Sequence, residues 1–121
     1  MIRVLICDDH QIVRQGIKQI LADASDLALA GEAGNGPEAI ARVRAGGIDV
    51  VLMDIAMPQR DGLDVLKQLK AEFPKLPVLM LSTYPDRQYA VRSLKLGAAG
   101  YLNKSADAEQ MTEAIRRVAG G

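Results

Sequence analysis

The sequence lacks the features of an exported, membrane-spanning or nucleic-acid-binding protein. Its 15 lysines and arginines balance 15 aspartates and glutamates, whereas domains that bind DNA or anionic membranes are usually basic. The longest aliphatic runs, such as Val50 to Met53, have about four residues, and a membrane helix needs roughly 20. The N-terminus has no signal-peptide pattern. The composition therefore predicts one soluble domain that works in the cytoplasm and has no membrane partner.

The scarcity of cysteine and histidine excludes several kinds of site. Cys7 is the only cysteine, so the chain can form neither an internal disulfide nor a thiolate zinc site. We expect Cys7 to be buried and to act as a small apolar residue. His10 is the only histidine, and we expect it at the start of a helix, facing solvent. The sequence also lacks the G-x-S-x-G pattern of serine hydrolases and the phosphate-binding P-loop.

Short apolar runs alternate five times with stretches of helical periodicity. The predicted strands are Ile2–Ile6, Leu27–Ala30, Val50–Met53, Val78–Leu81 and Gly100–Leu102. Apolar residues recur at helical spacing within 12–21, 37–43, 63–73, 86–96 and 111–118. Ser105 is expected to cap the last helix. The alternation predicts an α/β domain with a parallel sheet covered by helices on both faces.

Polar side chains directly follow four of the five predicted strands. Asp8 and Asp9 come after the first strand, Asp54 after the third, Ser82 after the fourth, and Lys104 shortly after the fifth. In parallel sheets, ligands bind at the carboxyl ends of the strands. These five residues are therefore expected to share one site.

The expected site suits phosphoryl transfer. Three clustered carboxylates repel one another, and Mg²⁺ is the simplest cation to relieve them. Asp54 would then be free as a nucleophile toward phosphorus, with Lys104 and Ser82 contacting the phosphoryl oxygens. Taken singly, each residue also has a structural explanation. Asp8 or Asp9 could cap a helix, Asp54 could be a turn residue, Ser82 a loop hydroxyl and Lys104 a solvated cation.

Four segments in order resemble the receiver domain of bacterial two-component response regulators. They read VLICDDH, VVLMDIAMPQRDGLDVL, VLMLSTY and LGAAGYLNK, and the resemblance is strongest to the LuxR/NarL class. It implies a flavodoxin-like (βα)5 three-layer sandwich, a five-stranded parallel sheet of order 2-1-3-4-5. Members usually carry a C-terminal helix-turn-helix domain. We expect residues 1–121 to be the receiver alone, with that output domain missing from this chain.

The resemblance also implies roles for the site residues. Asp54 is the phosphoacceptor, and Lys104 pairs with the phosphoryl oxygens. Mg²⁺ is held by Asp8, Asp9, Asp54 and the backbone carbonyl of Ala56. The chain then acts as a regulator rather than a metabolic enzyme, although it contributes most of the phosphotransfer chemistry.

The partners and the switch follow from the same resemblance. The donor is a sensor histidine kinase, and DNA is reached only through the missing C-terminal domain. Ser82 is the hydroxyl that moves toward the phosphoryl group, and Tyr101 is the aromatic that changes rotamer with it. We expect phosphorylation to change the exposed face of the fourth and last helices and to favour a homodimer, for transcription regulation.

Three departures from the family pattern and two alternatives stay open. Ser105 replaces the proline that often follows the lysine, so a trans peptide bond is expected there. Thr83 stands where many receivers have alanine, and Asn103 is more polar than the usual aliphatic residue. One alternative is a degenerate receiver that only binds partners. The other is an aspartate-nucleophile phosphatase, which needs a second acid where this chain has Ala56.

Overall fold

The computed structural model describes residues 1–57, 61–82 and 87–120. Within them five strands alternate with five helices. The elements are β1 (Ile2–Cys7), α1 (Gln11–Ala22), β2 (Leu27–Ala33), α2 (Gly36–Ala45), β3 (Val50–Asp54), α3 (Gly62–Glu72), β4 (Val78–Ser82), α4 (Arg87–Lys95), β5 (Gly100–Asn103) and α5 (Ala108–Ala119). No described helix combines the length and apolarity that a bilayer-spanning segment requires.

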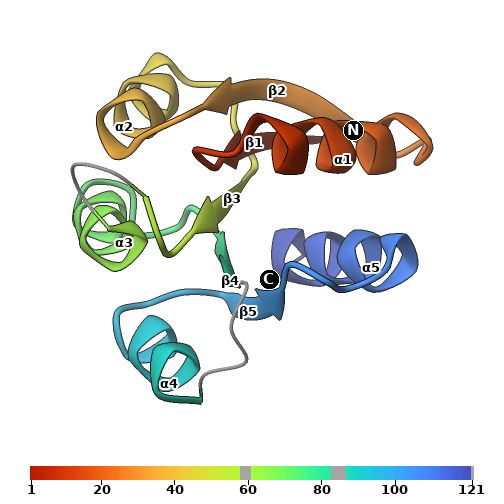
Figure 1. Ribbon diagram of the computed structural model, residues 1–121. Coiled ribbons are helices and arrows are strands. Elements are labelled where there is room, and N and C mark those ends of the chain that lie inside the picture. Colours follow the sequence, from red (N-terminus) through yellow and green to blue (C-terminus); the bar gives the residue numbers. More distant parts are fainter. Residues whose placement is uncertain (58–60, 83–86, 121) are drawn as a thin grey trace.

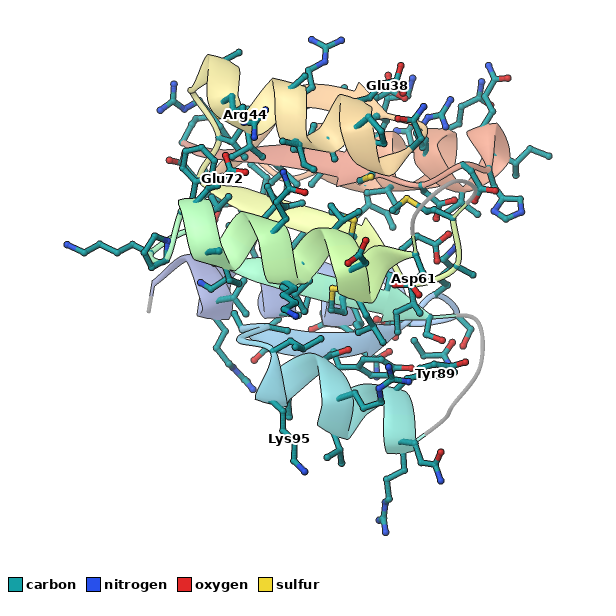
Figure 2. The ribbon with its side chains drawn as sticks, turned by 90° about the vertical axis from the view of Figure 1, so that its left-hand side faces the viewer. Glu38, Arg44, Asp61, Glu72, Tyr89 and Lys95 are labelled. Atoms are coloured by element: carbon teal, nitrogen blue, oxygen red, sulfur yellow. The ribbon has the colours of Figure 1, made fainter. Side chains whose placement is uncertain are left out.

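The strands form one parallel sheet in the order β2-β1-β3-β4-β5. Helices α1 and α5 cover one face, and α2, α3 and α4 cover the other (Figures 1 and 2). The predicted flavodoxin-like fold, including its strand order, is confirmed. Because all strands are parallel, their carboxyl ends lie at the same edge of the sheet.

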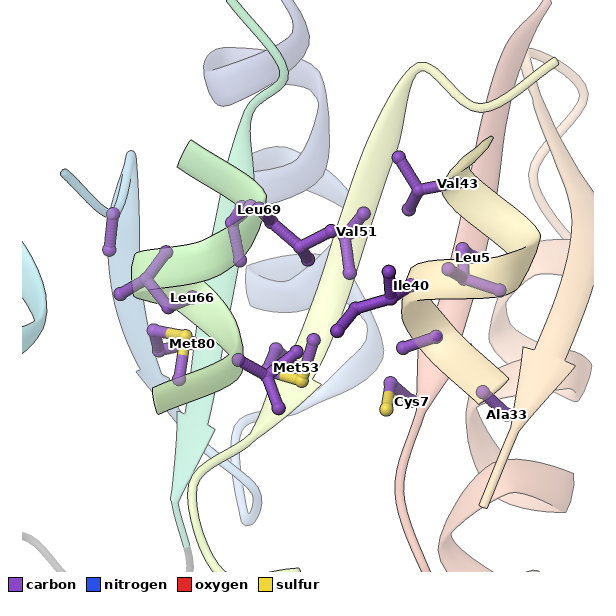
Figure 3. Close-up of a cluster of buried hydrophobic side chains, with 14 of the residues drawn as sticks. Leu5, Cys7, Ala33, Ile40, Val43, Val51, Met53, Leu66, Leu69 and Met80 are labelled. Atoms are coloured by element: carbon purple, nitrogen blue, oxygen red, sulfur yellow. The ribbon is translucent and has the colours of Figure 1, made fainter. Parts of the chain in front are cut away.

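Alternate residues of the central strands feed two separate cores. Leu5, Cys7, Val51, Met53 and Met80 belong to the core under α2 and α3 (Figure 3). Their sequence neighbours point to the opposite face, where α1 and α5 supply the partners. The strands are thus buried on both faces, which explains why their apolar runs are continuous rather than alternating.

Cys7 is fully buried in this core, as predicted. Burial raises the pKa of its thiol to about 12, and the nearby charges of Asp8 and Asp54 act in the same direction. The thiolate form is therefore strongly disfavoured at neutral pH.

One helix start differs from the sequence-based expectation, and another excludes an alternative that the sequence left open. The cap of α5 is Asp107 rather than Ser105, because the Asp107 side chain accepts a hydrogen bond from the Gln110 N–H while the Asp107 N–H donates one to Gln110 Oε1, a reciprocal capping box. Ser105 instead donates its N–H and hydroxyl to Asn103 Oδ1, at 2.8 and 2.7 Å. At α1 the cap position is His10, so neither Asp8 nor Asp9 caps that helix. The expected start of the fourth helix, Asp86, lies outside the described residues.

Candidate functional site

The carboxyl ends of neighbouring strands bring the predicted site residues together. Asp54 is the last residue of β3 and Ser82 is the last residue of β4, while Asp8 and Lys104 directly follow β1 and β5. Strand β3 lies between β1 and β4, and β5 pairs with β4. Residues separated by almost the whole chain therefore meet at the middle of one sheet edge.

The centre of the site is a buried group of three charges. The Lys104 ammonium lies 2.7 Å from Asp8 Oδ2 and 3.1 Å from Asp54 Oδ2. Asp8 and Asp54 are 0% and 2% exposed. Neither Oδ2 accepts a well-directed hydrogen bond from the described residues, so the ammonium charge is what compensates these two oxygens. One cation thus faces two buried anions.

This imbalance changes the proton affinities of the group. Burial and the charge of Asp8 raise the pKa of Asp54 above its ordinary 3.8, against the opposing effects of Lys104 and the Ala56 N–H. Burial alone would lower the pKa of Lys104, but its two carboxylate neighbours outweigh burial and raise it. Lys104 therefore stays cationic, and the ionised form of Asp54 gains from any further positive charge.

Asp8 is held in place by three neighbouring groups. Its backbone N–H donates to the Ala33 carbonyl at 3.0 Å, and its own carbonyl accepts from Arg14 Nη1 at 2.6 Å. Its Oδ1 accepts from the His10 N–H at 2.8 Å. The Asp8 carboxylate is thus fixed before any ligand arrives.

The acidic residues also meet the only histidine of the chain. His10 starts α1 and its side chain is 63% exposed, as predicted, but its Nδ1 lies 3.2 Å from Asp8 Oδ1 and 3.1 Å from Asp9 Oδ1. Asp8, Asp9, His10 and Asp54 each offer a ligand atom, and these atoms all lie within 4.8 Å of one another. The sequence analysis gave His10 no part in the site, although its position beside two aspartates was a signal.

Gly62 is a second residue that the sequence analysis missed. It opens α3, and its N–H donates to the Ile55 carbonyl at 2.6 Å. A Cβ atom at position 62 would overlap the backbone carbonyl of Asp54. Only glycine lets the start of α3 lie this close to the end of β3. The available signal was the glycine itself. A helix start does not require the conformational freedom of glycine, so its presence there indicates a close contact.

The two predicted switch residues lie on adjacent strands. Ser82 is buried, and its carbonyl accepts the Lys104 N–H at 2.8 Å. Tyr101 on β5 is half-buried against the core on the α2, α3 and α4 face. The backbone N–H of Ala56 donates to Asp54 Oδ1 at 3.2 Å, while the role of its carbonyl stays a prediction. Thr83 lies outside the described residues, which contain no cis peptide bond.

Comparison with known families and proteins gives a consistent result. The family model of the response regulator receiver domain matches residues 4–116. The chain is 38% identical to the response regulator UvrY of Escherichia coli O6:H1 and 40% identical to the response regulator GacA of Pseudomonas viridiflava. Both alignments cover all of this chain and 56% of the relative, so the chain spans about half the length of these curated relatives.

Solved structures share the fold. The signal receiver domain of the response regulator NarL from Mycobacterium tuberculosis has a TM-score of 0.92 and 30% identity, over 99% of this chain and 97% of that one. A chain of the CheX–CheY–BeF3–Mg²⁺ complex from Borrelia burgdorferi has a TM-score of 0.90 and 26% identity, over 97% of this chain and 88% of that one.

Proposed function

The chain belongs to the response regulator receiver domain family, and we propose that it is a cytoplasmic signalling switch phosphorylated on Asp54 by the phosphohistidine of a sensor kinase. The observation that carries this proposal is the buried contact of Lys104 with Asp8 and Asp54 at the carboxyl edge of the sheet. A lysine bridging two buried carboxylates leaves excess negative charge, which is costly unless a ligand uses it. A structural ion pair would need only one carboxylate.

The proposed reaction forms an acyl phosphate. An oxygen of the Asp54 carboxylate attacks phosphorus, and the P–N bond to the imidazole of the kinase breaks. The electron pair of that bond stays on the imidazole nitrogen, which takes a proton from solvent. Lys104 is 3.1 Å from Asp54 Oδ2, so its ammonium can follow the charge onto the phosphoryl oxygens. Ser82 would contact the same oxygens.

The acidic cluster fits Mg²⁺. Asp8, Asp9 and Asp54 would hold the ion together with the predicted carbonyl of Ala56, and two observations support the fit. The buried Oδ2 atoms of Asp8 and Asp54 receive no well-directed hydrogen bond from residues 1–57, 61–82 and 87–120, and the ligand atoms of the cluster lie within 4.8 Å of one another. When bound, the ion neutralises charge on the transferred phosphoryl group. The similar CheY complex was solved with Mg²⁺ and BeF3.

The proposed output is a change of surface that favours self-association. Ser82 and Tyr101 flank α4, whose Val91 and Leu94 are 44% and 53% exposed beside basic residues. This mixed face suits contact with a second copy. On the last helix, the Arg116 guanidinium pairs with Asp26 at 2.7 and 2.9 Å, so it is already occupied within the chain. DNA would be reached through a C-terminal helix-turn-helix domain of a longer protein, giving transcription regulation.

Intact-mass measurement after incubation with acetyl phosphate and Mg²⁺ tests the proposal. We expect the wild type to gain one acid-labile phosphoryl group and Asp54→Asn to gain none. Asp64→Asn is the matched control, because Asp64 is an exposed aspartate on α3 outside the cluster, and it should label like the wild type. Sedimentation velocity on the same samples tests self-association. Equal labelling of Asp54→Asn would reject the phosphoacceptor, and no labelling of the wild type would favour the degenerate receiver.

A further inference from the structure

The proposed phosphoryl transfer uses every side chain of the acidic cluster except His10. The imidazole also has no structural task in the helix, because His10 occupies the cap position of α1 without a side-chain cap bond. Its Nδ1 nevertheless points to the carboxylates, 3.2 Å from Asp8 Oδ1 and 3.1 Å from Asp9 Oδ1. The cluster therefore presents one nitrogen and three carboxylates to the same space.

The distances from His10 Nδ1 to the Asp8 and Asp9 oxygens suit ligands of one ion. Two ligand atoms that each lie about 2.1 Å from a metal, at right angles, are about 3.0 Å apart. The distances from His10 Nδ1 to the two carboxylate oxygens are close to this value. The ring is 63% exposed, so it can adjust its orientation while the buried Asp8 stays fixed. Without metal, the same spacing suits hydrogen bonds from the ring to the carboxylates.

We propose that His10 Nδ1 is a fourth side-chain ligand at this site, and that it makes the site prefer divalent ions with an affinity for imidazole, such as Zn²⁺, over Mg²⁺. This inference rests on the proposed metal site of the function above. Carboxylate and water ligands suit Mg²⁺, whereas one imidazole among carboxylates favours Zn²⁺ and neighbouring transition metals. Zn²⁺ would then compete with Mg²⁺ for Asp9 and Asp54 and put a nitrogen ligand beside the phosphoacceptor.

The chain offers a direct readout because it has one histidine. In untagged protein at a mildly alkaline pH, the imidazole gives a single set of ring resonances in NMR spectra. We expect ZnCl2 to shift the resonance of His10 Nδ1, because the metal coordinates this nitrogen directly. We expect no such coordination shift of the Nδ1 resonance with MgCl2. Calorimetric titration with each salt supplies the two affinities.

Three variants separate this inference from the proposed function. His10→Phe keeps a ring without nitrogen, and we expect the ratio of Zn²⁺ to Mg²⁺ affinity to fall about tenfold or more. The double variant His10→Phe/Gln11→His keeps one histidine but moves it one residue along α1, and it should not restore the ratio. Asp9→Asn should weaken the binding of both Zn²⁺ and Mg²⁺.

The outcomes are distinct. An unchanged ratio in His10→Phe, or restoration by the displaced histidine, would overturn the role of His10 while leaving the Mg²⁺ site intact. Zn²⁺ binding that depends on His10 but not on Asp9 would also overturn it, since the nitrogen would then belong to another site. A wild type that binds neither ion would reject the metal site of the proposed function as well.

Discussion

The ion pairs at the two edges of the sheet differ in burial and in charge balance. At the amino edge, Arg44 and Glu72 meet in a bidentate pair at 2.9 and 2.8 Å, with side chains 56% and 31% exposed. Figure 2 shows this pair at the far end of α2 and α3 from Asp61, the residue before α3. At the carboxyl edge, Lys104 contacts two carboxylates that are almost fully buried. The first pair is balanced and solvated, and the second group is neither.

The difference teaches which edge serves structure and which serves chemistry. A solvated one-to-one pair has little desolvation to offset and little energy to gain. A buried group with more anions than cations is destabilising by itself. It persists because packing elsewhere in the fold supplies enough stability to hold it in place. Here the two cores on either side of the sheet hold the strands whose ends carry the excess charge. The unbalanced edge is therefore the one to which we assign the proposed phosphoryl transfer.

The largest effect should come from removing the Lys104 ammonium, the cation that contacts both buried carboxylates. Lys104→Met keeps an apolar stem but leaves Asp8 and Asp54 buried with like charges. Breaking a fully buried pair costs roughly 3–5 kcal/mol, and because the Lys104 side chain is 11% exposed we expect about 2 kcal/mol. Urea unfolding without divalent cations measures the loss, and added Mg²⁺ should recover part of it.

The matched control is Lys67→Met, which removes an exposed lysine from α3. It should leave the free energy of unfolding nearly unchanged. The double variant Lys104→Met/Asp54→Asn should be more stable than Lys104→Met alone, because it removes one of the two facing charges. Equal losses in the two lysine variants would mean that Lys104 is no more buried, energetically, than a surface lysine.

A smaller effect of opposite sign is expected from Asp54→Asn. The pKa of Asp54 is raised in the folded state, first by burial and then by Asp8. The folded protein therefore binds its proton more tightly than the unfolded chain, so stability falls as pH rises through the folded pKa. Asparagine removes this cost. In metal-free buffer we expect a melting temperature a few degrees above the wild type at neutral pH, with the gain vanishing below about pH 4.

Asp49 at the amino edge provides the mirror-image control. A hydrogen bond from the Arg3 backbone N–H lowers the pKa of Asp49, so its contribution is present above the unfolded pKa and is lost as pH falls through the folded one. Asp49→Asn should therefore lower the melting temperature at neutral pH. Thermal unfolding of both variants against pH should give difference curves of opposite sign. Two curves of the same sign would contradict the assigned environments.

Sequence reasoning reached the sheet edge but not all of its contents. Short apolar runs located the carboxyl ends of the strands to within one to three residues, and this was enough to group Asp8, Asp54 and Lys104. The sequence analysis missed His10 and Gly62 because their roles depend on distances across turns. His10 lies beside the carboxylate of Asp9, and Gly62 lies against the backbone carbonyl of Asp54. Ser105 and Asp107 are both residues that can cap a helix, so the sequence did not distinguish them. The reciprocal hydrogen bonds with Gln110 select Asp107.

The smallest effect is expected at the Arg44–Glu72 pair, although it is bidentate. Arg44 Nε donates to Glu72 Oε1 and Arg44 Nη2 donates to Glu72 Oε2, yet the partners stay exposed to water. Water and salt screen such a pair, and ordering two long side chains offsets most of its attraction. Arg44→Met, Glu72→Gln and the double variant should each keep the melting temperature within about 2 °C of the wild type. A double-mutant cycle in low and high salt measures the coupling, which should be small and should shrink with salt. A coupling as large as the loss in Lys104→Met would show that burial is not what separates the two edges.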